Sequence, residues 1–267
     1  MPLAASPPRA VLITGAAGGI GQALCAEFLA AGWHVLATDH PAAVPPPGSA
    51  PLALTWFPLD LAAFSRDVAI RKSFATQVRS ALAALAPPLP VPRSLPLACL
   101  VNNAAVQRLG RTENVTAEDW ESSFGVNLVA PFLLAQTFLP QLEAARSSVV
   151  NIGSIHAQLT KPGLMVYATT KAALSGMTRS LAVDLGSRVR VNAICPAAIA
   201  TPTLEAGFVG RPEARRQLAE FQPSGRIGQP AEVARVALFL AGPDAQFMTG
   251  SCLSLDGAIS GRLHDPA

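Results

Sequence analysis

The chain has few charged residues and no long apolar run. Charged side chains make up 14% of its 267 residues, and the formal net charge is only +3. Lysine and arginine are scattered, and their densest spot, Arg215-Arg216, is interpreted as a solvated helix face, so no basic stripe argues for nucleic acid. No stretch approaches the roughly 18 uninterrupted apolar residues of a membrane-spanning helix. We therefore expect no nucleic acid and no membrane among the partners.

The chain also lacks the cysteine spacing of metal or disulfide sites. Its cysteines are far apart, without a CxxC pair, and each lies in an otherwise apolar run: Cys25, Cys99, Cys195 and Cys252. Buried, reduced thiols are the interpretation, which suits a cytoplasmic protein, and no metal ion is expected. Residues 1–9 have no basic region followed by an apolar run, so they are expected to be a flexible end and not a signal peptide.

Hydrophobic residues, in contrast, make up half of the chain, which is ample for a large buried core and argues against disorder. Because α/β folds often run to roughly 200–250 residues as one unit, residues 1–267 are expected to form a single domain. Prolines gather mainly in residues 41–51 and 87–96. These clusters are interpreted as stiff connecting loops, since strand-like segments continue on both sides.

A glycine-rich turn follows the first apolar segment. Residues 10–14 are typical of a buried parallel strand, and they run directly into Gly15-Ala-Ala-Gly-Gly-Ile-Gly21 and a helical pattern over residues 22–31, which Gly32 closes. A strand, a glycine turn and a helix start can cradle a pyrophosphate, because missing Cβ atoms allow close approach and the helix N-terminus supplies free N–H groups. A purely structural glycine turn is the alternative.

An acidic residue ends the next expected strand, residues 33–38. Asp39 lies 18 residues after Gly21, near the position where a dinucleotide fold places a carboxylate to accept hydrogen bonds from ribose hydroxyls. The same charge would repel a 2′-phosphate, and no Arg or Lys follows closely, so NAD is preferred over NADP, although a protonated His40 would soften that preference. An Asp that merely ends a strand at a turn is the alternative.

Strand-like and helix-like segments alternate along the rest of the chain. Further strands are expected at residues 54–59, 97–101, 148–152, 189–194 and 252–255, and helices at residues 65–85, 166–185 and 233–241. The alternation predicts an α/β fold with a single Rossmann-type, doubly wound parallel sheet and helices on both faces. Gly15, Asp39, Asp60, Asn102 and Ser154 each close a strand at what would be one common edge, where such folds bind ligands.

A long helical segment is expected between two of these strands. Thr116 and Asp119 have the spacing of a capping box, with Asp in place of the usual Glu or Gln, and open the segment. Pro131 and Pro140 are expected to bend or divide it. Asn127 lies within it.

Tyr167 is the only tyrosine of the chain, and Lys171 follows it by four residues in an expected helix. Residues four apart point the same way on a helix. A nearby cation makes a phenol more acidic than its usual pKa of about 10, and therefore a usable proton donor and acceptor near neutral pH. For such a pair alone, an ordinary helix with an unrelated Tyr and Lys is the alternative.

These features together resemble the short-chain dehydrogenase/reductase family over roughly residues 10–260. The resemblance rests on the glycine loop, Asn102-Asn103-Ala104, Asn127, Ser154 and Tyr167-x-x-x-Lys171. The glycine spacing is similar to that of the family's compact branch, with TGxxxGxG and YxxxK motifs, and not to the longer sugar-nucleotide epimerase branch. The resemblance implies a single dinucleotide-binding and catalytic domain that transfers a hydride between NAD(H) and a secondary alcohol or ketone. It also implies a homo-oligomer, expected to be a tetramer built on the helices around Asn127 and Lys171.

The resemblance implies a role for each site residue. Tyr167 exchanges a proton with the substrate oxygen, and Lys171 lowers the Tyr167 pKa and binds the nicotinamide ribose. Ser154 steadies the substrate oxygen, and Asn127 holds a water that links Lys171 to solvent. The implied cofactor contacts are Gly15, Gly19, Ile20, Gly21, Asp39, Asp60, Leu61, Asn103, Ala104, Tyr167, Lys171, Pro196, Ile199 and Thr201. The candidate substrate contacts are Gln107, His156 and Met165, with a lid within residues 203–226.

Alanine stands at three positions where the family usually has glycine: Ala105, Ala197 and Ala258. An alanine that needs a positive φ costs about 1 kcal/mol, which puts the loop geometry near the nicotinamide in question but not the proton chemistry. Two other functions stay open: an NADPH-dependent 3-oxoacyl-thioester (acyl-carrier-protein) reductase, which Asp39 argues against, and a non-catalytic dinucleotide-binding sensor. A sugar, a polyol, a hydroxy acid and a ketone all remain candidate substrates.

Overall fold

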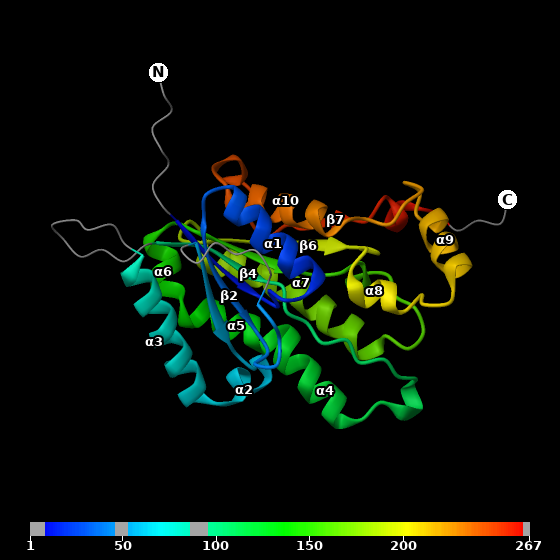
Figure 1. Cartoon of the computed structure of the whole chain (residues 1–267), viewed down its shortest axis with the longest axis horizontal. Helices are drawn as coiled ribbons and strands as arrows, with labels where there is room; N and C mark the ends of the chain where they lie inside the picture. Colours follow the sequence, from blue (N-terminus) through cyan, green and yellow to red (C-terminus); the bar gives the residue numbers. More distant parts are fainter. Residues whose placement is uncertain (1–8, 46–52, 86–95, 264–267) are drawn as a thin grey trace, which may run out of the picture.

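Seven short apolar segments form one parallel sheet (Figure 1). The computed structural model describes residues 9–45, 53–85 and 96–263. The strands are β1 (Ala10–Thr14), β2 (His34–Asp39), β3 (Leu54–Pro58), β4 (Leu97–Asn102), β5 (Ser148–Ile152), β6 (Arg190–Pro196) and β7 (Cys252–Leu255). Their order across the sheet is β3-β2-β1-β4-β5-β6-β7, and every neighbouring pair is parallel. Parallel strands need crossover connections, and helices supply them.

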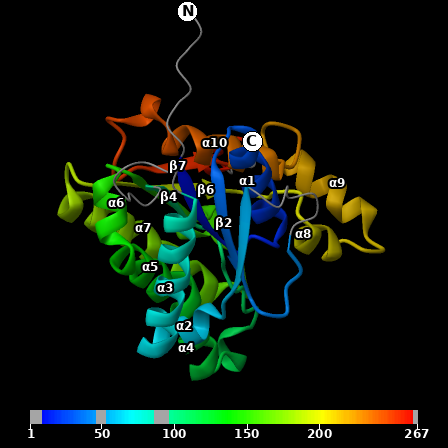
Figure 2. The same ribbon diagram turned by 60° about the vertical axis from the view of Figure 1, so that its left-hand side comes forward.

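Helices cover both faces of this sheet (Figures 1 and 2). They are α1 (Gly19–Ala30), α2 (Leu61–Arg66), α3 (Val68–Ala84), α4 (Ala117–Phe124), α5 (Ala130–Thr137), α6 (Leu139–Ala144), α7 (Met165–Leu185), α8 (Pro202–Ala206), α9 (Pro212–Phe221) and α10 (Pro230–Ala241). In β1, Leu12 packs into a core with α2, α3, α5, α6 and α7, whereas Val11 and Ile13 pack into a second core with α1 and α10. The alternation of side chains along a buried strand thus fills two cores, and the predicted fold class is confirmed.

The helix expected over residues 65–85 is two helices. Asp60 caps α2, since its Oδ1 accepts a hydrogen bond from the Ala62 N–H at 2.8 Å. Asp67 ends α2 in an extended conformation and caps α3 by accepting from the Ala69 N–H at 2.7 Å. A capping Asp competes with the backbone for hydrogen bonds, which is why one helical pattern divides there.

The segment after Thr116 divides as expected and also contains a wider turn. The capping box of Thr116 and Asp119 is present at the start of α4. Pro131 and Pro140 lie in the first turns of α5 and α6, where a missing N–H is tolerated. Between α4 and α5, Gly125–Val129 forms a π-helical turn that contains Asn127, which the sequence did not reveal.

Some expectations lie outside the described residues. Residues 1–8 are not described, so the expected flexibility of residues 1–9 stays a prediction, as does the single domain over residues 1–267. Most of the two proline-rich loops is likewise not described. Among the described helices, none combines the length and the apolar character needed to cross a membrane.

Candidate active site

Five polar or glycine positions meet at the carboxyl edge of the sheet. Gly15, Asp60 and Ser154 follow the ends of β1, β3 and β5 closely, and Asp39 and Asn102 are the last residues of β2 and β4. Because all these strands are parallel, their carboxyl ends lie along one edge. The predicted common edge is therefore confirmed.

The glycine loop is shaped for a close approach. Gly15 has φ +65°, and a Cβ there would lie 2.7 Å from the Ala104 Cα; a Cβ on Gly21 would lie 1.9 Å from the Gly15 carbonyl oxygen. The end of β4 fixes the loop, since Asn103 Nδ2 donates to the carbonyl oxygens of Thr14 and Gly15, each at 2.9 Å. The cradle without side chains at the start of α1 fits a pyrophosphate.

The carboxylates at the ends of β2 and β3 make different contacts. Asp39 Oδ2 accepts from the Ala17 N–H at 2.8 Å, and its Oδ1 accepts from the His40 N–H at 2.7 Å. Asp39 thus lies directly beside the glycine loop, where a ribose would sit. The side chain of Asp60 caps α2. Leu61, which was predicted to contact the adenine together with Asp60, is buried.

Tyr167 and Lys171 lie one turn apart on α7. The Lys171 Nζ is 5.6 Å from the Tyr167 ring centroid and donates to the Ile152 carbonyl oxygen at 2.7 Å. Lys171 is only 2% exposed, and this burial lowers its pKa to about 8. The expected pairing on one helix face is confirmed, and the carbonyl at the end of β5 holds the ammonium in place.

The Ser154 hydroxyl lies beside the phenol. Its Oγ accepts from the His156 N–H at 3.1 Å, and it acts on the Tyr167 hydroxyl. Burial raises the pKa of Tyr167, and the Ser154 hydroxyl opposes this rise but does not cancel it. Desolvation dominates the Tyr167 pKa here and the Lys171 ammonium donates to Ile152, so the expectation that Lys171 lowers the Tyr167 pKa stays a prediction.

Asn127 ties the loop after β4 to α7. Its Nδ2 donates to the Val106 carbonyl oxygen at 2.9 Å and to Thr170 Oγ1 at 3.0 Å, and its Oδ1 accepts from the Val106 N–H at 2.8 Å. Thr170 directly precedes Lys171, so these bonds position the turn of α7 that carries Lys171. We refer to Asn127, Ser154, Tyr167 and Lys171 together as the tetrad. Both amide hydrogens are used, and the water implied for Asn127 stays a prediction.

The residues predicted to contact the nicotinamide lie at the end of β6 and in the segment between β6 and α8, next to the glycine loop. Pro196 ends β6, Ile199 is buried and bridges to Gly228, and Thr201 caps α8 by accepting from the Leu204 N–H at 3.2 Å. A Cβ on Gly19 would lie 3.0 Å from the Thr201 Cβ, so the start of α8 contacts the loop. Ile20 is half-buried in the first turn of α1.

The three candidate substrate contacts differ in how close they lie to Tyr167. The His156 ring meets the Tyr167 ring edge-on, with centroids 6.0 Å apart. Its pKa is lowered, first by burial and then by the charge of Lys161. Gln107 and Met165 are exposed, which places them at the rim. Of the three, His156 is in contact with the tetrad.

Several residues that build the site carried no sequence signal. Thr14 Oγ1 accepts from the backbone N–H groups of Asn103 and Ala104, each at 3.0 Å, and so joins β1 to β4. In the expected lid, Glu205 of α8 and Arg215 of α9 form a bidentate ion pair at 2.7 and 2.8 Å. The Arg215-Arg216 face is thus solvated as expected, but its first member also holds two helices together.

The three alanines at positions where the family usually has glycine differ in their backbone conformation. Ala258 has φ +69°, the left-handed conformation that favours glycine. Ala105 and Ala197 are not among the residues with positive φ. The cost of about 1 kcal/mol therefore applies to Ala258, beyond β7, and not to the other two.

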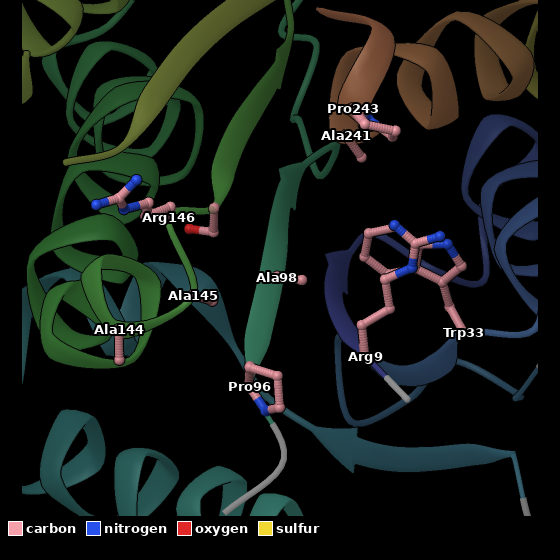
Figure 3. Close-up of a pocket in the computed structure, with 10 residues that line it drawn as sticks. Arg9, Trp33, Pro96, Ala98, Ala144, Ala145, Arg146, Ala241 and Pro243 are labelled. Atoms are coloured by element: carbon pink, nitrogen blue, oxygen red, sulfur yellow. The ribbon is translucent and has the colours of Figure 1, made fainter. Parts of the chain in front are cut away.

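A separate cavity of about 430 Å³ lies at the opposite edge of the sheet (Figure 3). It is lined by residues next to the amino ends of the strands, among them Arg9, Trp33, Pro96 and Ser147. The Arg9 guanidinium stacks over the Trp33 ring at 4.5 Å. Its place at the amino ends separates this cavity from the tetrad.

Comparisons with known proteins agree with this geometry. A family model described as enoyl-(acyl carrier protein) reductase matches residues 15–260. The protein FixR of Bradyrhizobium diazoefficiens is 34% identical, over 94% of this chain and 86% of its own. Galactitol 2-dehydrogenase (L-tagatose-forming) of Cereibacter sphaeroides is 31% identical, over 93% of each chain.

Solved structures share the fold. An aldohexose dehydrogenase of Thermoplasma acidophilum has a TM-score of 0.84 at 28% identity and covers 98% of this chain and 97% of its own. At 25% identity and a TM-score of 0.78, a 3-ketoacyl-(acyl-carrier-protein) reductase of Brucella melitensis, which covers 95% of this chain and 99% of its own, is complexed with NADH. The chain therefore belongs to the short-chain dehydrogenase/reductase family, whose members are oxidoreductases that act on CH–OH groups.

Proposed function

We propose that the protein is an NAD(H)-dependent dehydrogenase of a secondary alcohol, or reductase of the corresponding ketone, with Tyr167 as general acid and base. The observation that carries the proposal is the placement of Tyr167 and Lys171 one turn apart on α7, with Ser154 beside the phenol, at the sheet edge that bears the glycine loop. When bound, the nicotinamide supplies hydride acceptance and donation.

Each residue of the tetrad has its own role in the proton transfer. In alcohol oxidation Tyr167 accepts the hydroxyl proton of the substrate, and in ketone reduction it returns one. Ser154 accepts from the His156 N–H, so its own hydrogen is the one that it can donate, and in the complex it donates to the charge on the substrate oxygen. Lys171 holds a positive charge near the phenol and binds the nicotinamide ribose, and Asn127 holds the Lys171 turn in register and a water that links it to solvent.

A Tyr167→Phe variant tests this proposal. It removes the hydroxyl and keeps the ring, so NADH affinity should stay unchanged while turnover falls by about 10²–10⁴. Thr169→Val, on the exposed side of the same helix, is the control and should keep both. Equal turnover of Tyr167→Phe and the parent protein would rule out the assignment. Binding without turnover in the parent protein would instead favour the dinucleotide sensor.

We propose NAD as the cofactor, because Asp39 lies beside the glycine loop and a carboxylate there repels a 2′-phosphate. NADH should bind at least about tenfold tighter than NADPH, a difference of about 1.4 kcal/mol, in a fluorescence titration. Asp39→Ala should erase the difference, and Asp67→Ala, an exposed helix cap outside the loop, should keep it. Tighter binding of NADPH would contradict the proposal and favour the NADPH-dependent 3-oxoacyl-thioester reductase.

The substrate proposed is a small polar alcohol or ketone. His156 offers a polar ring against Tyr167, and the exposed Gln107 offers an amide at the rim. A dehydrogenase screen over sugars, polyols and hydroxy acids is the direct test. We also propose a cytoplasmic protein, for which the free cysteines are suitable, and a homotetramer built on the helices around Asn127 and Lys171.

A further inference from the structure

Three buried polar side chains form a row between the sheet and α7. Asn102 at the end of β4 and Asn151 of β5 are register partners, so both side chains lie on the same face of the sheet. Asn102 Nδ2 donates to Asn151 Oδ1 at 2.8 Å, and Asn151 Nδ2 donates to Thr178 Oγ1 of α7 at 2.9 Å. The Thr178 hydroxyl in turn donates to the Leu174 carbonyl oxygen at 2.8 Å. This polar row of Asn102, Asn151 and Thr178 therefore joins two strands to one helix.

The polar row is enclosed by apolar side chains. Asn151 and Thr178 are 0% exposed, and Asn102 is 3% exposed. Two residues earlier on the same face of β4 and β5, Leu100 and Val149 belong to the core that α7 helps to close. The Asn102 Oδ1 atom has no hydrogen-bond partner within residues 9–45, 53–85 and 96–263. Desolvated amides and an unpaired oxygen cost folding free energy, so stability alone does not explain why amides occupy these positions.

Asn151 lies at the centre of the polar row and directly precedes the residue that holds Lys171. The Ile152 carbonyl oxygen accepts from Lys171 Nζ at 2.7 Å. Thr178 follows Lys171 by seven residues, or two turns, so both side chains lie on the same face of α7. The helix is therefore attached to the end of β5 at two points. One such contact would leave α7 free to rotate about it, whereas two contacts fix its direction as well.

The other end of the polar row leads to the glycine loop. Asn102 directly precedes Asn103, whose Nδ2 donates to the carbonyl oxygens of Thr14 and Gly15, each at 2.9 Å. Through Asn102, Asn151 thus connects the strand that holds the glycine loop to the helix that carries the reacting pair.

We propose that Asn151 is a positioning residue for the reaction: it holds α7, and with it Tyr167 and Lys171, in place against the glycine loop. The proposal rests on the proposed function, since it assigns Asn151 a role in that same site. Asn151 acts through Thr178 and Ile152. Apolar packing keeps α7 on the sheet, but it is not directional, so the hydrogen bonds of the polar row set where the helix lies. A displacement of about 1 Å can lower turnover by about a hundredfold.

Two substitutions of Thr178 separate positioning from packing. Valine keeps the shape of threonine but lacks the hydroxyl that accepts from Asn151, whereas serine keeps the hydroxyl and lacks the methyl group. With the alcohol that the dehydrogenase screen identifies, kcat should fall about tenfold in Thr178→Val and stay within about twofold of the parent value in Thr178→Ser. A packing role predicts the opposite order, with serine the worse variant. That order, or an unchanged kcat in Thr178→Val, overturns the proposal.

Thr169→Val is the matched control for the loss of a threonine hydroxyl. Its Oγ1 donates to the Met165 carbonyl oxygen of its own helix at 2.9 Å, and its side chain is exposed, so kcat should be unchanged. Circular dichroism verifies that each variant folds. If Thr178→Val does not fold, Thr178→Ala takes its place, because it differs from Thr178→Ser only in the hydroxyl; kcat should then be about tenfold lower in Thr178→Ala than in Thr178→Ser, and equal values overturn the proposal.

Crystal structures of the variants give a readout that needs no turnover. The distance from Lys171 Nζ to the Ile152 carbonyl oxygen, 2.7 Å in the parent protein, should exceed the roughly 3.2 Å of a hydrogen bond in Thr178→Val and stay unchanged in Thr178→Ser. An unchanged distance in Thr178→Val contradicts the proposal. If the parent protein turns over no alcohol, the proposed function fails, and this distance still decides whether the polar row positions Lys171.

Discussion

Lys171 is a cation placed where water cannot reach it. Its side chain is 2% exposed, and its ammonium donates to the Ile152 carbonyl oxygen. One neutral hydrogen bond does not replace a hydration shell, which is why the pKa falls to about 8. The charge that the chemistry needs is therefore held at a cost in folding free energy.

This cost predicts a pH dependence of stability. Between about pH 8 and the roughly 10.4 of an unfolded lysine, the unfolded chain binds more protons than the folded one, so stability rises with pH across that window. From pH 7.5 to 9.5, the parent protein should gain about 2 kcal/mol of unfolding free energy relative to Lys171→Met. Urea unfolding of both proteins at the two pH values measures it. A constant difference between them would show that the ammonium is not desolvated.

The spacing of Tyr167 and Lys171 predicted the reacting pair, because helix geometry alone sets which side chains share a face. The direction of the Tyr167 pKa was not predictable, because desolvation depends on the packing of residues far apart in the chain. Thr14 was missed for the same reason, and Cys252, expected to be buried, is only partly buried. A threonine or a cysteine in an apolar strand looks the same whatever distant groups pack against it.

At the scale of elements, strands were predicted more closely than helix interruptions. β1, β5 and β7 have the predicted bounds, because apolar runs between turn residues mark them clearly. The π-helical turn at Gly125–Val129 was not predictable, since one extra residue in a helical turn leaves no trace in composition. It matters here because Asn127 on that turn reaches both Val106 and Thr170.

The lid was expected as a variable loop, but it contains two helices. Glu205 and Arg215 join α8 to α9, and the carboxylate and guanidinium are each more than a third exposed. Such an exposed pair adds little to global stability, yet it restrains two short helices that have few other contacts.

Glu205→Gln should therefore loosen the lid without unfolding the protein. Amide hydrogen exchange in α8 and α9 is expected to become severalfold faster, while α10 and the melting temperature stay unchanged. Glu143→Gln, which breaks an exposed ion pair with Arg188 away from the lid, is the matched control. Equal exchange in all three proteins would mean that other contacts hold the lid.

For the whole molecule, the alternation of strands and helices predicted the architecture because each buried strand must be covered on both faces. The two cores on either side of β1 show that requirement met within one chain. Some large apolar side chains remain exposed in the single chain, and their positions are informative as well. On the outer side of one helical layer, Val129 and Phe132, in the π-helical turn and α5, are each 38% exposed, and Val183 on α7 is 85% exposed.

The proposed homotetramer explains this apolar exposure, since α5 and α7 are the helices on which it is built. Phe132→Glu should abolish assembly, because a carboxylate buried in an interface loses its hydration without gaining a partner. Light scattering at micromolar concentration should give four times the 27.6 kDa of one chain for the parent protein and a lower mass for the variant. Val68→Glu, at an exposed apolar position on α3, should leave the mass unchanged, and circular dichroism confirms that both variants fold. A monomeric parent protein, or a tetrameric Phe132→Glu variant, would place the interface elsewhere or exclude it.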